Sequence, residues 1–215
     1  PLGGTTIYPG SGKSIAVAIS PLTHTVIDSN AGGYFGPYLK FSGWDALEIQ
    51  GKASGEVIVY IDGDQGRVLI EEAENLPSDT HLLGPLLTTK YGAENPRSIS
   101  IISAGSGAEH TRMGCLNFSW HDRQRNLVRY KQAGRGGIGS VLRDKHVKAI
   151  IVKYSAMSAD INQPAHNDVL KQVGPAYNQE IRSLDPQQHR MALVGTTHLI
   201  PIMNEVDLLP TNNFK

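Results

Sequence analysis

Four glycine-rich segments hold the residues of this sequence that could bind a ligand: residues 3–12, 30–36, 105–107 and 134–139. Glycine lets the backbone come close to a bound group, and amide N–H groups exposed at such turns attract anions. Two of these segments have a basic residue beside or within them, Lys13 and Arg135. A cation next to exposed amides is a common way to hold phosphate, so we expect an anionic ligand.

The segment Asn30-Ala31-Gly32-Gly33 is the most informative of the four. Its small residues permit close approach of the backbone, and they give way to a short helix that we expect to end at Gly43. This segment alone is explained by a tight turn, but basic residues at two separate glycine segments favour one shared ligand. We therefore predict that residues 30–33 and 134–137 approach each other in space.

Two nucleotide-binding motifs are matched only in part. Residues 10–14, Gly-Ser-Gly-Lys-Ser, resemble the end of a P-loop, but Ile7 stands where the first glycine is required and a strand-like run follows. Residues 134–139 satisfy G-x-G-x-x-G, yet residues 127–133 before them are too polar for a buried parallel strand. We reject the P-loop and keep a nucleotide-binding dehydrogenase, using the Gly134 to Gly139 loop, as an alternative.

The elements that must position these segments begin with strands. Alternating, β-branched runs predict them at residues 14–19, 56–61, 67–70, 98–102 and 147–152. The sequence Asp-Gly-Asp-Gln-Gly at 62–66 predicts a hairpin turn, because aspartate and glycine tolerate the positive φ of such turns. Residues 120–126 are polar and are expected to form a surface loop. The fold class predicted is α+β, with two packed sheets and short helices.

Helices are expected at 79–91 and directly after the glycines at 134–139. Beyond Tyr154 the pattern changes, since apolar residues recur at helical spacing over 167–183 and 186–205. Breaks are expected near Gly174-Pro175 and near Pro201. We predict a ligand-binding β-rich domain at 1–154 and the beginning of a helical domain at 155–215.

Composition excludes several classes of protein. With 20 basic and 20 acidic residues and 40% hydrophobic residues, neither disorder nor a nucleic-acid partner is indicated. No apolar run approaches the roughly 20 residues that span a bilayer, and no signal peptide is recognisable, so we expect a cytoplasmic protein without a membrane partner. Cys115 is the single cysteine, which excludes an iron-sulfur site built from this chain alone, and the eight histidines show no metal-ligand spacing.

One long pattern links the glycine segments. It comprises Asn30-Ala31-Gly32-Gly33, Leu39-Lys40, Gly43, Asp45 and residues 48–53, with further pieces at 1–5, 11–13, 20–23, 133–141, 148–150, 204–205, 209–211 and 213–214. The pattern resembles the amino-terminal domain of the aldehyde ferredoxin oxidoreductase family. The resemblance reaches both ends of the chain.

This resemblance implies a β-sheet base for a tungsten atom held by the dithiolenes of two pyranopterins, whose phosphates meet at a magnesium ion. The sequence does not choose between tungsten and molybdenum. The implied pterin contacts are Lys13, Asn30, Ala31, Gly32 and Gly33 on one side and Arg135, Gly136 and Gly137 on the other. The family usually has arginine at the position of Lys13, and lysine lacks the planar fork of a bidentate contact, so a simple ion pair is expected there.

The resemblance also implies a reaction, in which an aldehyde is oxidised with water to a carboxylic acid. Two electrons leave through a 4Fe-4S cluster to ferredoxin or to an iron-sulfur subunit. The family's cluster ligands and catalytic residues follow the Asn213-Phe214 motif, so we expect a fragment of a longer protein and assign no catalytic residue here. A homodimer is compatible with the resemblance to this family. The alternatives are a related aromatic acyl-CoA reductase subunit and a non-catalytic assembly without cofactor.

Overall fold

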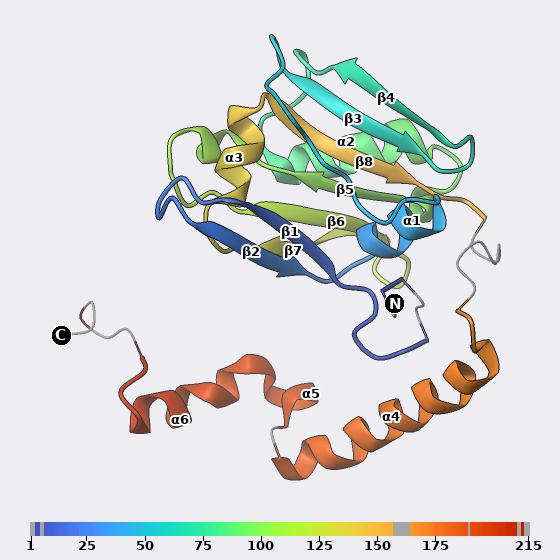
Figure 1. Ribbon diagram of the computed structural model, residues 1–215, viewed down its shortest axis with the longest axis vertical. Coiled ribbons are helices and arrows are strands. Elements are labelled where there is room, and N and C mark those ends of the chain that lie inside the picture. The colour runs from blue at the N-terminus through green and yellow to red at the C-terminus, as the bar shows by residue number, and fades with distance from the viewer. Residues whose placement is uncertain (1–2, 5–6, 157–163, 189, 210–211, 213–215) are drawn as a thin grey trace. The chain divides into compact units, whose positions relative to one another are not determined.

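The structure is a computed structural model that describes residues 3–4, 7–156, 164–188, 190–209 and 212 (Figure 1). The chain forms two compact units, one of residues 1–6 and 10–165 and the other of residues 7–9 and 166–215. Two pieces of the sequence pattern, at 1–2 and at 210–214, lie wholly or largely outside the described residues.

The strands of the first unit form a two-stranded and a six-stranded sheet. The two-stranded sheet pairs β1 (Ser14–Ile19) with β2 (Val26–Ala31). The six-stranded sheet has the order β4-β3-β8-β5-β6-β7. Its strands are β3 (Val57–Asp62), β4 (Arg67–Glu72), β5 (Ile99–Ser103), β6 (Leu116–Asp122), β7 (Leu127–Ala133) and β8 (Val147–Lys153).

Strand β8 lies in the middle of the larger sheet, and its sequence explains why. Its side chains from Val147 to Val152 are buried, as a strand covered on both faces requires. It pairs in parallel with β3 and antiparallel with β5. Between its pairs with Val57 and Ile58, β8 has one extra residue, Lys148, so that a β-bulge redirects this side chain.

Each face of the six-stranded sheet covers its own core (Figure 1). The helix α2 (Thr80–Gly92) covers one face, where Leu83 and Leu87 pack on Ile101 and Ile151. The β1–β2 sheet, α1 (Phe35–Phe41) and α3 (Ile138–Asp144) contribute to the core on the other face. The predicted α+β class with two packed sheets is therefore confirmed.

Helix boundaries follow the expected local signals. Asp79 is the N-cap of α2 and accepts a hydrogen bond from the backbone N–H of His81 at 2.7 Å. After α1, Gly43 takes a φ of 91°, which glycine adopts without strain. The 62–66 segment turns between β3 and β4 as predicted. Two short 3₁₀ helices, η1 (Pro96–Ser98) and η2 (Ser106–Glu109), flank β5.

The prediction of a surface loop at residues 120–126 was wrong in part. Trp120 and Asp122 lie in β6, which forms a hairpin with β7. The sequence 127–133 is polar because β7 is an antiparallel edge strand, in which Arg129 and Lys131 are exposed while Tyr130 is half-buried. Strand β2 was also missed, since Asp28, Ser29 and Asn30 have low strand propensity.

The second unit contains α4 (Asn167–Gln188), α5 (Met191–Val194), η3 (Gly195–His198) and α6 (Leu199–Glu205). The predicted break at Gly174-Pro175 was wrong, because α4 continues through Pro175. Residues 7–9 pack against this part of α4, where Gly174 leaves no room for a Cβ beside the carbonyl oxygen of Ile7. The rings of Tyr8 and Tyr177 also meet, with centroids 5.8 Å apart. This packing offsets the roughly 3 kcal/mol that proline costs inside a helix. No helix of the described residues is long and apolar enough to cross a membrane.

Candidate cofactor-binding site

The register of β1 and β2 brings Lys13 opposite Gly32. Ser14 pairs with Ala31, so the residues just beyond the pair, Lys13 and Gly32, face each other where the small sheet ends. The Nζ atom of Lys13 lies 3.9 Å from the position that a Cβ on Gly32 would occupy. The structure thus brings together two residues that the resemblance places on the same side of one ligand.

The fold restricts the side chain at position 33 but not at position 32. Apart from the mobile end of Lys13, nothing lies within 4 Å of a Cβ at Gly32, and its φ is ordinary. Gly33 has a φ of 119°, and a Cβ there would lie 3.3 Å from the indole ring of Trp120. The fold therefore requires glycine at position 33, whereas at position 32 it leaves open space that a ligand could use.

The 134–137 loop lies beside the middle of β2. The backbone N–H of Arg135 donates a hydrogen bond to Ser29 Oγ at 3.1 Å, although the two residues are 106 positions apart in the chain. The Arg135 side chain is exposed, and in the part of the chain that the structure describes it has no hydrogen-bond or ion-pair partner. The guanidinium group of Arg135 is thus available to a ligand. The loop that carries it is hydrogen-bonded to β2, the strand that ends at Asn30 and Ala31.

Gly136 and Gly137 have reasons in the fold itself. Their φ values are 67° and 75°. A Cβ on Gly136 would lie 2.4 Å from Cδ1 of Ile27, and one on Gly137 would lie 2.0 Å from the carbonyl oxygen of Arg112. Gly136 thus lets the loop pack onto β2, and Gly137 lets it pack against the backbone of Arg112, whether or not a ligand binds.

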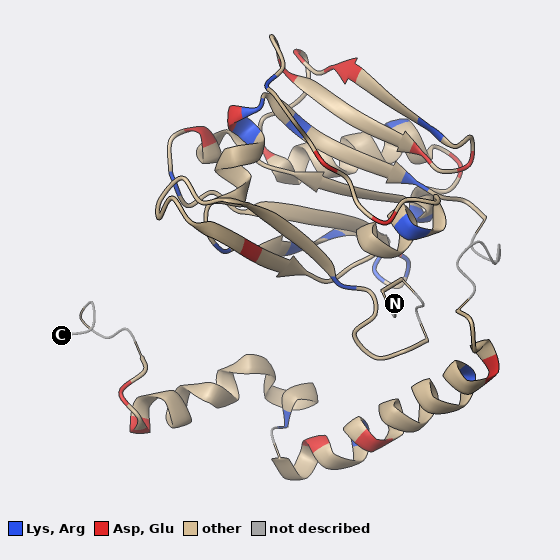
Figure 2. Ribbon diagram, viewed as in Figure 1, with Lys and Arg blue, Asp and Glu red and all other residues tan. Residues whose placement is uncertain are grey.

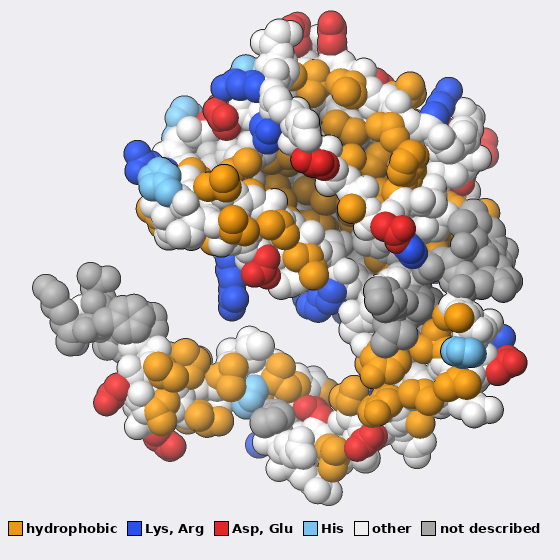
Figure 3. All heavy atoms as spheres, in the orientation of Figure 1, with side chains coloured by type: hydrophobic (Ala, Val, Ile, Leu, Met, Phe, Trp, Pro, Cys, Tyr) orange, Lys and Arg blue, Asp and Glu red, His pale blue; other side chains and the backbone are white. Residues whose placement is uncertain are grey.

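The outer face of the small sheet is apolar beside these groups. Ile15, Val17, Ile19 and Val26 are each exposed by more than 60%, and hydrophobic side chains gather there (Figure 3). Asn30 shares this face, since it pairs with Ile15. Its Nδ2 donates a hydrogen bond to Asp28 Oδ2 at 3.1 Å, which orients the carboxamide. Figure 2 shows the basic position where β1 begins and the acidic position within β2.

These groups suit a phosphorylated pterin better than a bare metal ion. They supply an ammonium, a guanidinium, a carboxamide and the backbone beside an open glycine, which bind anionic and heterocyclic oxygen and nitrogen atoms. Among the described residues, no group of three or more His, Cys, Asp or Glu side chains could hold a metal. The residues present therefore fit the pterin and phosphate parts of the cofactor that the resemblance implies.

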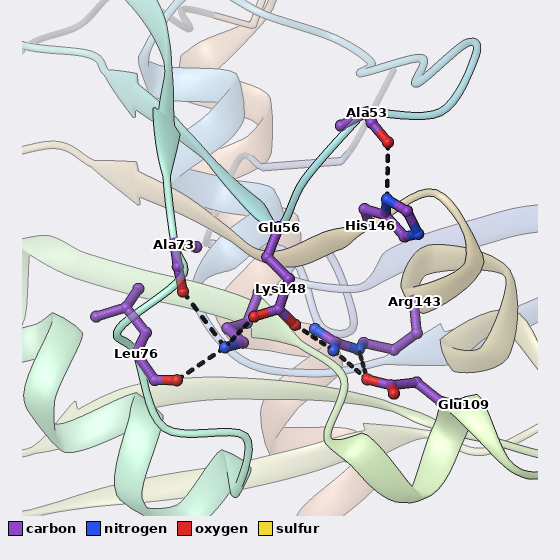
Figure 4. Close-up of polar contacts among 8 residues, drawn as sticks. All are labelled: Ala53, Glu56, Ala73, Leu76, Glu109, Arg143, His146 and Lys148. Atoms are coloured by element: carbon purple, nitrogen blue, oxygen red, sulfur yellow. Dashed lines mark hydrogen bonds and ion pairs between the residues drawn. The ribbon is translucent and has the colours of Figure 1, made fainter.

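Sequence reasoning missed a second polar cluster, built around Glu56 (Figure 4). Its carboxylate binds Lys148 Nζ at 2.6 Å and also binds the guanidinium of Arg143, which is paired with Glu109 as well. The Lys148 Nζ atom donates to the carbonyl oxygens of Ala73 and Leu76, at 3.3 and 2.8 Å. A lysine inside the apolar run of β8 was the signal that such a partner must exist.

The charges of this cluster stabilise one another. Although burial acts to raise the pKa of Glu56, hydrogen bonds from Lys148 and Arg143 hold it below its usual value. Burial acts to lower the pKa of Arg143, but the hydrogen bonds to Glu109 and Glu56 raise it. The cluster borders a cavity of about 560 Å³ lined by residues of both charges, including Lys52 and Asp144. It connects β3, β8, α3 and η2, and this role is structural.

The strand, glycine loop and helix around 134–139 do not form a dinucleotide-binding unit. Such a unit needs two parallel neighbouring strands joined by the helix. Here β7 is an edge strand and β8 is central, and the pairings through β5 and β6 make β7 and β8 antiparallel. Likewise, residues 10–12 precede a strand and not a helix, which agrees with the rejection of a P-loop.

Comparison with known proteins identifies relatives of the whole chain. The family model of the aldehyde ferredoxin oxidoreductase N-terminal domain matches residues 1–154. The tungsten-containing aldehyde ferredoxin oxidoreductases of Pyrococcus horikoshii and Pyrococcus abyssi are 31% and 32% identical over 219 and 222 aligned residues. In both cases the match covers 100% of this chain and 33% of the relative, so the chain spans about a third of their length.

A solved structure agrees with this relationship. It is the active site complex BamBC of benzoyl coenzyme A reductase with 1,5-dienoyl-CoA, and it aligns with a TM-score of 0.58 and 27% identity. The alignment covers 69% of this chain and 21% of that one. Because the family model matches residues 1–154, the chain belongs to the aldehyde ferredoxin oxidoreductase family, of which it carries the N-terminal domain.

Proposed function

We propose that residues 1–154 form the cofactor-binding domain of a tungsten or molybdenum bis-pterin oxidoreductase, and that residues 155–215 begin its second domain. The observation that carries the proposal concerns Lys13 and Gly32, which face each other at the end of the small sheet. The ammonium group of Lys13 lies beside open space at Gly32. Because the fold itself does not exclude a side chain at position 32, the glycine there is best explained by a ligand.

Each residue has a defined part in this proposal. Lys13 forms an ion pair with a phosphate, and Gly32 lets the backbone approach the pterin. Asn30, oriented by Asp28, donates to or accepts from the heterocycle. Arg135 neutralises a phosphate from the neighbouring loop. Ala31, Gly33, Gly136 and Gly137 hold the backbone in the shape that presents these groups.

The reaction follows from the cofactor and the family. When bound, the tungstopterin would supply two-electron redox chemistry, and magnesium would offset the charge of its phosphates. We propose that an aldehyde and water become a carboxylic acid, with two protons and two electrons released. The electrons leave through a 4Fe-4S cluster to ferredoxin or an iron-sulfur subunit. Cys115 alone does not ligate such a cluster, so its ligands are outside this chain.

A second candidate is favoured by one observation, the alignment with the benzoyl coenzyme A reductase complex. The same cofactor frame would then serve the reduction of an aromatic acyl-CoA. The residues of the proposed site would bind the cofactor and not the substrate, so both candidates predict the same cofactor content. Assays with an aldehyde and with an aromatic acyl-CoA separate the two.

The proposal is tested by anaerobic purification from a host that makes the cofactor, followed by metal analysis and by pterin fluorescence after oxidation. We expect tungsten or molybdenum with two pterins per metal. Arg135→Ala should retain the cofactor roughly 10 to 150 times more weakly, because it removes charge-assisted hydrogen bonds of about 1.5 to 3 kcal/mol. Gly32→Val should lose the cofactor while the protein stays folded.

Matched controls separate ligand loss from damage to the fold. A Cβ at Gly107 meets nothing within 4 Å, so Gly107→Val adds the same side chain away from the site. Arg123 is another exposed arginine, in the turn between β6 and β7, and Arg123→Ala should keep full cofactor content. If Gly32→Val and Arg135→Ala both retain as much metal and pterin as these controls, the proposed site is wrong.

A further inference from the structure

Trp120 lies beneath the glycine turn of the proposed site. It belongs to β6, where its neighbours are Ser100 on β5 and Arg129 on β7. Its ring edge is the group nearest to the position that a Cβ on Gly33 would occupy, with Cε3 and Cζ3 at 3.3 and 3.4 Å from it. Strands on both sides hold Trp120, so its position is set by the larger sheet and not by the turn.

The turn also contacts this indole through Tyr34. The rings of Tyr34 and Trp120 have centroids 6.1 Å apart and an interplanar angle of 58°, a tilted arrangement typical of aromatic pairs. Tyr34 is 47% exposed, whereas Trp120 is half-buried. Gly33 and Tyr34 are thus both placed against one rigid ring, that of Trp120.

We propose that Trp120 is a positioning residue for the cofactor, acting through Gly33. Its indole ring supports the turn and so sets where the backbone of Gly32 stands relative to the Lys13 ammonium. The inference rests on the proposed function, because it assigns to Trp120 the geometry of the same site. It goes further by naming a side chain on the six-stranded sheet that determines how tightly the turn binds pterin.

A smaller side chain at position 120 removes this support. Trp120→Leu leaves space under Gly33, and because glycine has no Cβ to restrict its backbone, the turn can move into that space. Trp120→Phe keeps an aromatic ring on the same strand and fills part of the space. Loss of cofactor in the leucine variant and partial recovery in the phenylalanine variant are therefore expected.

The test compares these variants with Trp44→Phe in the 215-residue chain purified anaerobically from a host that makes tungstopterin. Trp44 is the other tryptophan of the chain and is 43% exposed. Pterin and tungsten content is measured together with the urea midpoint of each protein. We expect Trp120→Leu to retain about 10 to 100 times less cofactor, Trp120→Phe to recover part of it, and Trp44→Phe to match the wild type.

A spectroscopic measurement distinguishes positioning from general stability. In the Trp44→Phe protein, Trp120 is the sole tryptophan of the chain, so its emission reports on this one place. That emission should rise when the cofactor is released by oxidation and, per pterin released, by more than the emission of Trp44 in the Trp120→Phe protein.

Three results would overturn the inference. A folded Trp120→Leu protein with full pterin content would show that the indole does not set the turn. Pterin present in the Trp44→Phe protein without the larger change of Trp120 emission would place this ring away from the site, even if the leucine variant did not fold. A wild-type protein without any pterin would overturn the proposed function together with this inference, whereas the first two results leave that function intact.

Discussion

The substitution Glu56→Ala offers a quantitative test of the buried ionic cluster. It removes the counter-ion that Lys148 and Arg143 share, and their side chains are only 2% and 5% exposed. Removing one partner of a buried ion pair typically costs about 3 to 5 kcal/mol. We expect the lower end, about 3 kcal/mol, because the Glu56 side chain is itself 30% exposed and Lys148 keeps two carbonyl acceptors.

The assay is urea unfolding followed by tryptophan fluorescence. Both tryptophans, Trp44 and Trp120, belong to the first unit, so the signal reports on the unit that contains the cluster. A loss of about 3 kcal/mol should also lower the melting temperature by roughly 6 to 12 °C for a domain of this size. Glu94→Ala removes an exposed carboxylate and should change the free energy of unfolding by less than about 0.5 kcal/mol.

A double variant separates the ion pair from the space it fills. Replacing Glu56 and Lys148 together by leucine and methionine removes both charges, so Lys148 is no longer a buried cation without its partner, and Arg143 keeps its ion pair with Glu109. We expect this protein to be more stable than Glu56→Ala. Equal urea midpoints for Glu56→Ala and Glu94→Ala would refute the view that Glu56 neutralises the buried cations.

Three other predictions follow from single contacts. The pKa of Glu56 is lowered in the folded state, so its carboxylate stabilises the fold above the unfolded-state pKa of about 4.3. This stabilisation is lost as pH falls through the folded-state pKa. Between about pH 6 and pH 3, the wild type should therefore lose more unfolding free energy than Glu56→Gln. Gly136→Ala should cost roughly 2 to 5 kcal/mol in urea unfolding, from the positive φ and the collision with Ile27; a neutral effect would mean that the loop shifts freely. Asp79→Ala removes the hydrogen bond to His81 and should cost about 1 kcal/mol, whereas Asp79→Asn should restore most of it.

Much of the first unit could be predicted from local pattern. The strands with alternating or continuous β-branched residues were found, as were the 62–66 turn and the helix capped by Asp79. The β6–β7 hairpin was not predicted, because the residues that alternate with Trp120 and Asp122 along β6 are themselves polar. Its signal was present, since Val128 and Tyr130 point to the same face of β7, but polar edge strands lack the apolar contrast on which prediction relies.

The residues of the proposed site could be named from the sequence, but their geometry could not be predicted from it. The glycine segments and the two cations were recognised by type. That Lys13 faces Gly32 depends on the register of β1 against β2, and that Arg135 reaches Ser29 depends on contacts between residues over a hundred positions apart. The separate reasons for glycine at 32 and at 136 likewise require neighbours that no local pattern reveals.

The place of β8 in the sheet has a consequence for the order in which the chain can assemble during synthesis. β8 is the last strand of this sheet to leave the ribosome, yet it joins β3–β4 on one side to β5–β6–β7 on the other. Until residue 153 has emerged, the nascent chain holds two separate strand groups, each with an open edge that can pair with another chain. The β3–β8 pairing also closes a long loop, which slows folding. A nascent or truncated chain that stops before Val147 therefore cannot complete the sheet and exposes the edges of β3 and β5 to aggregation.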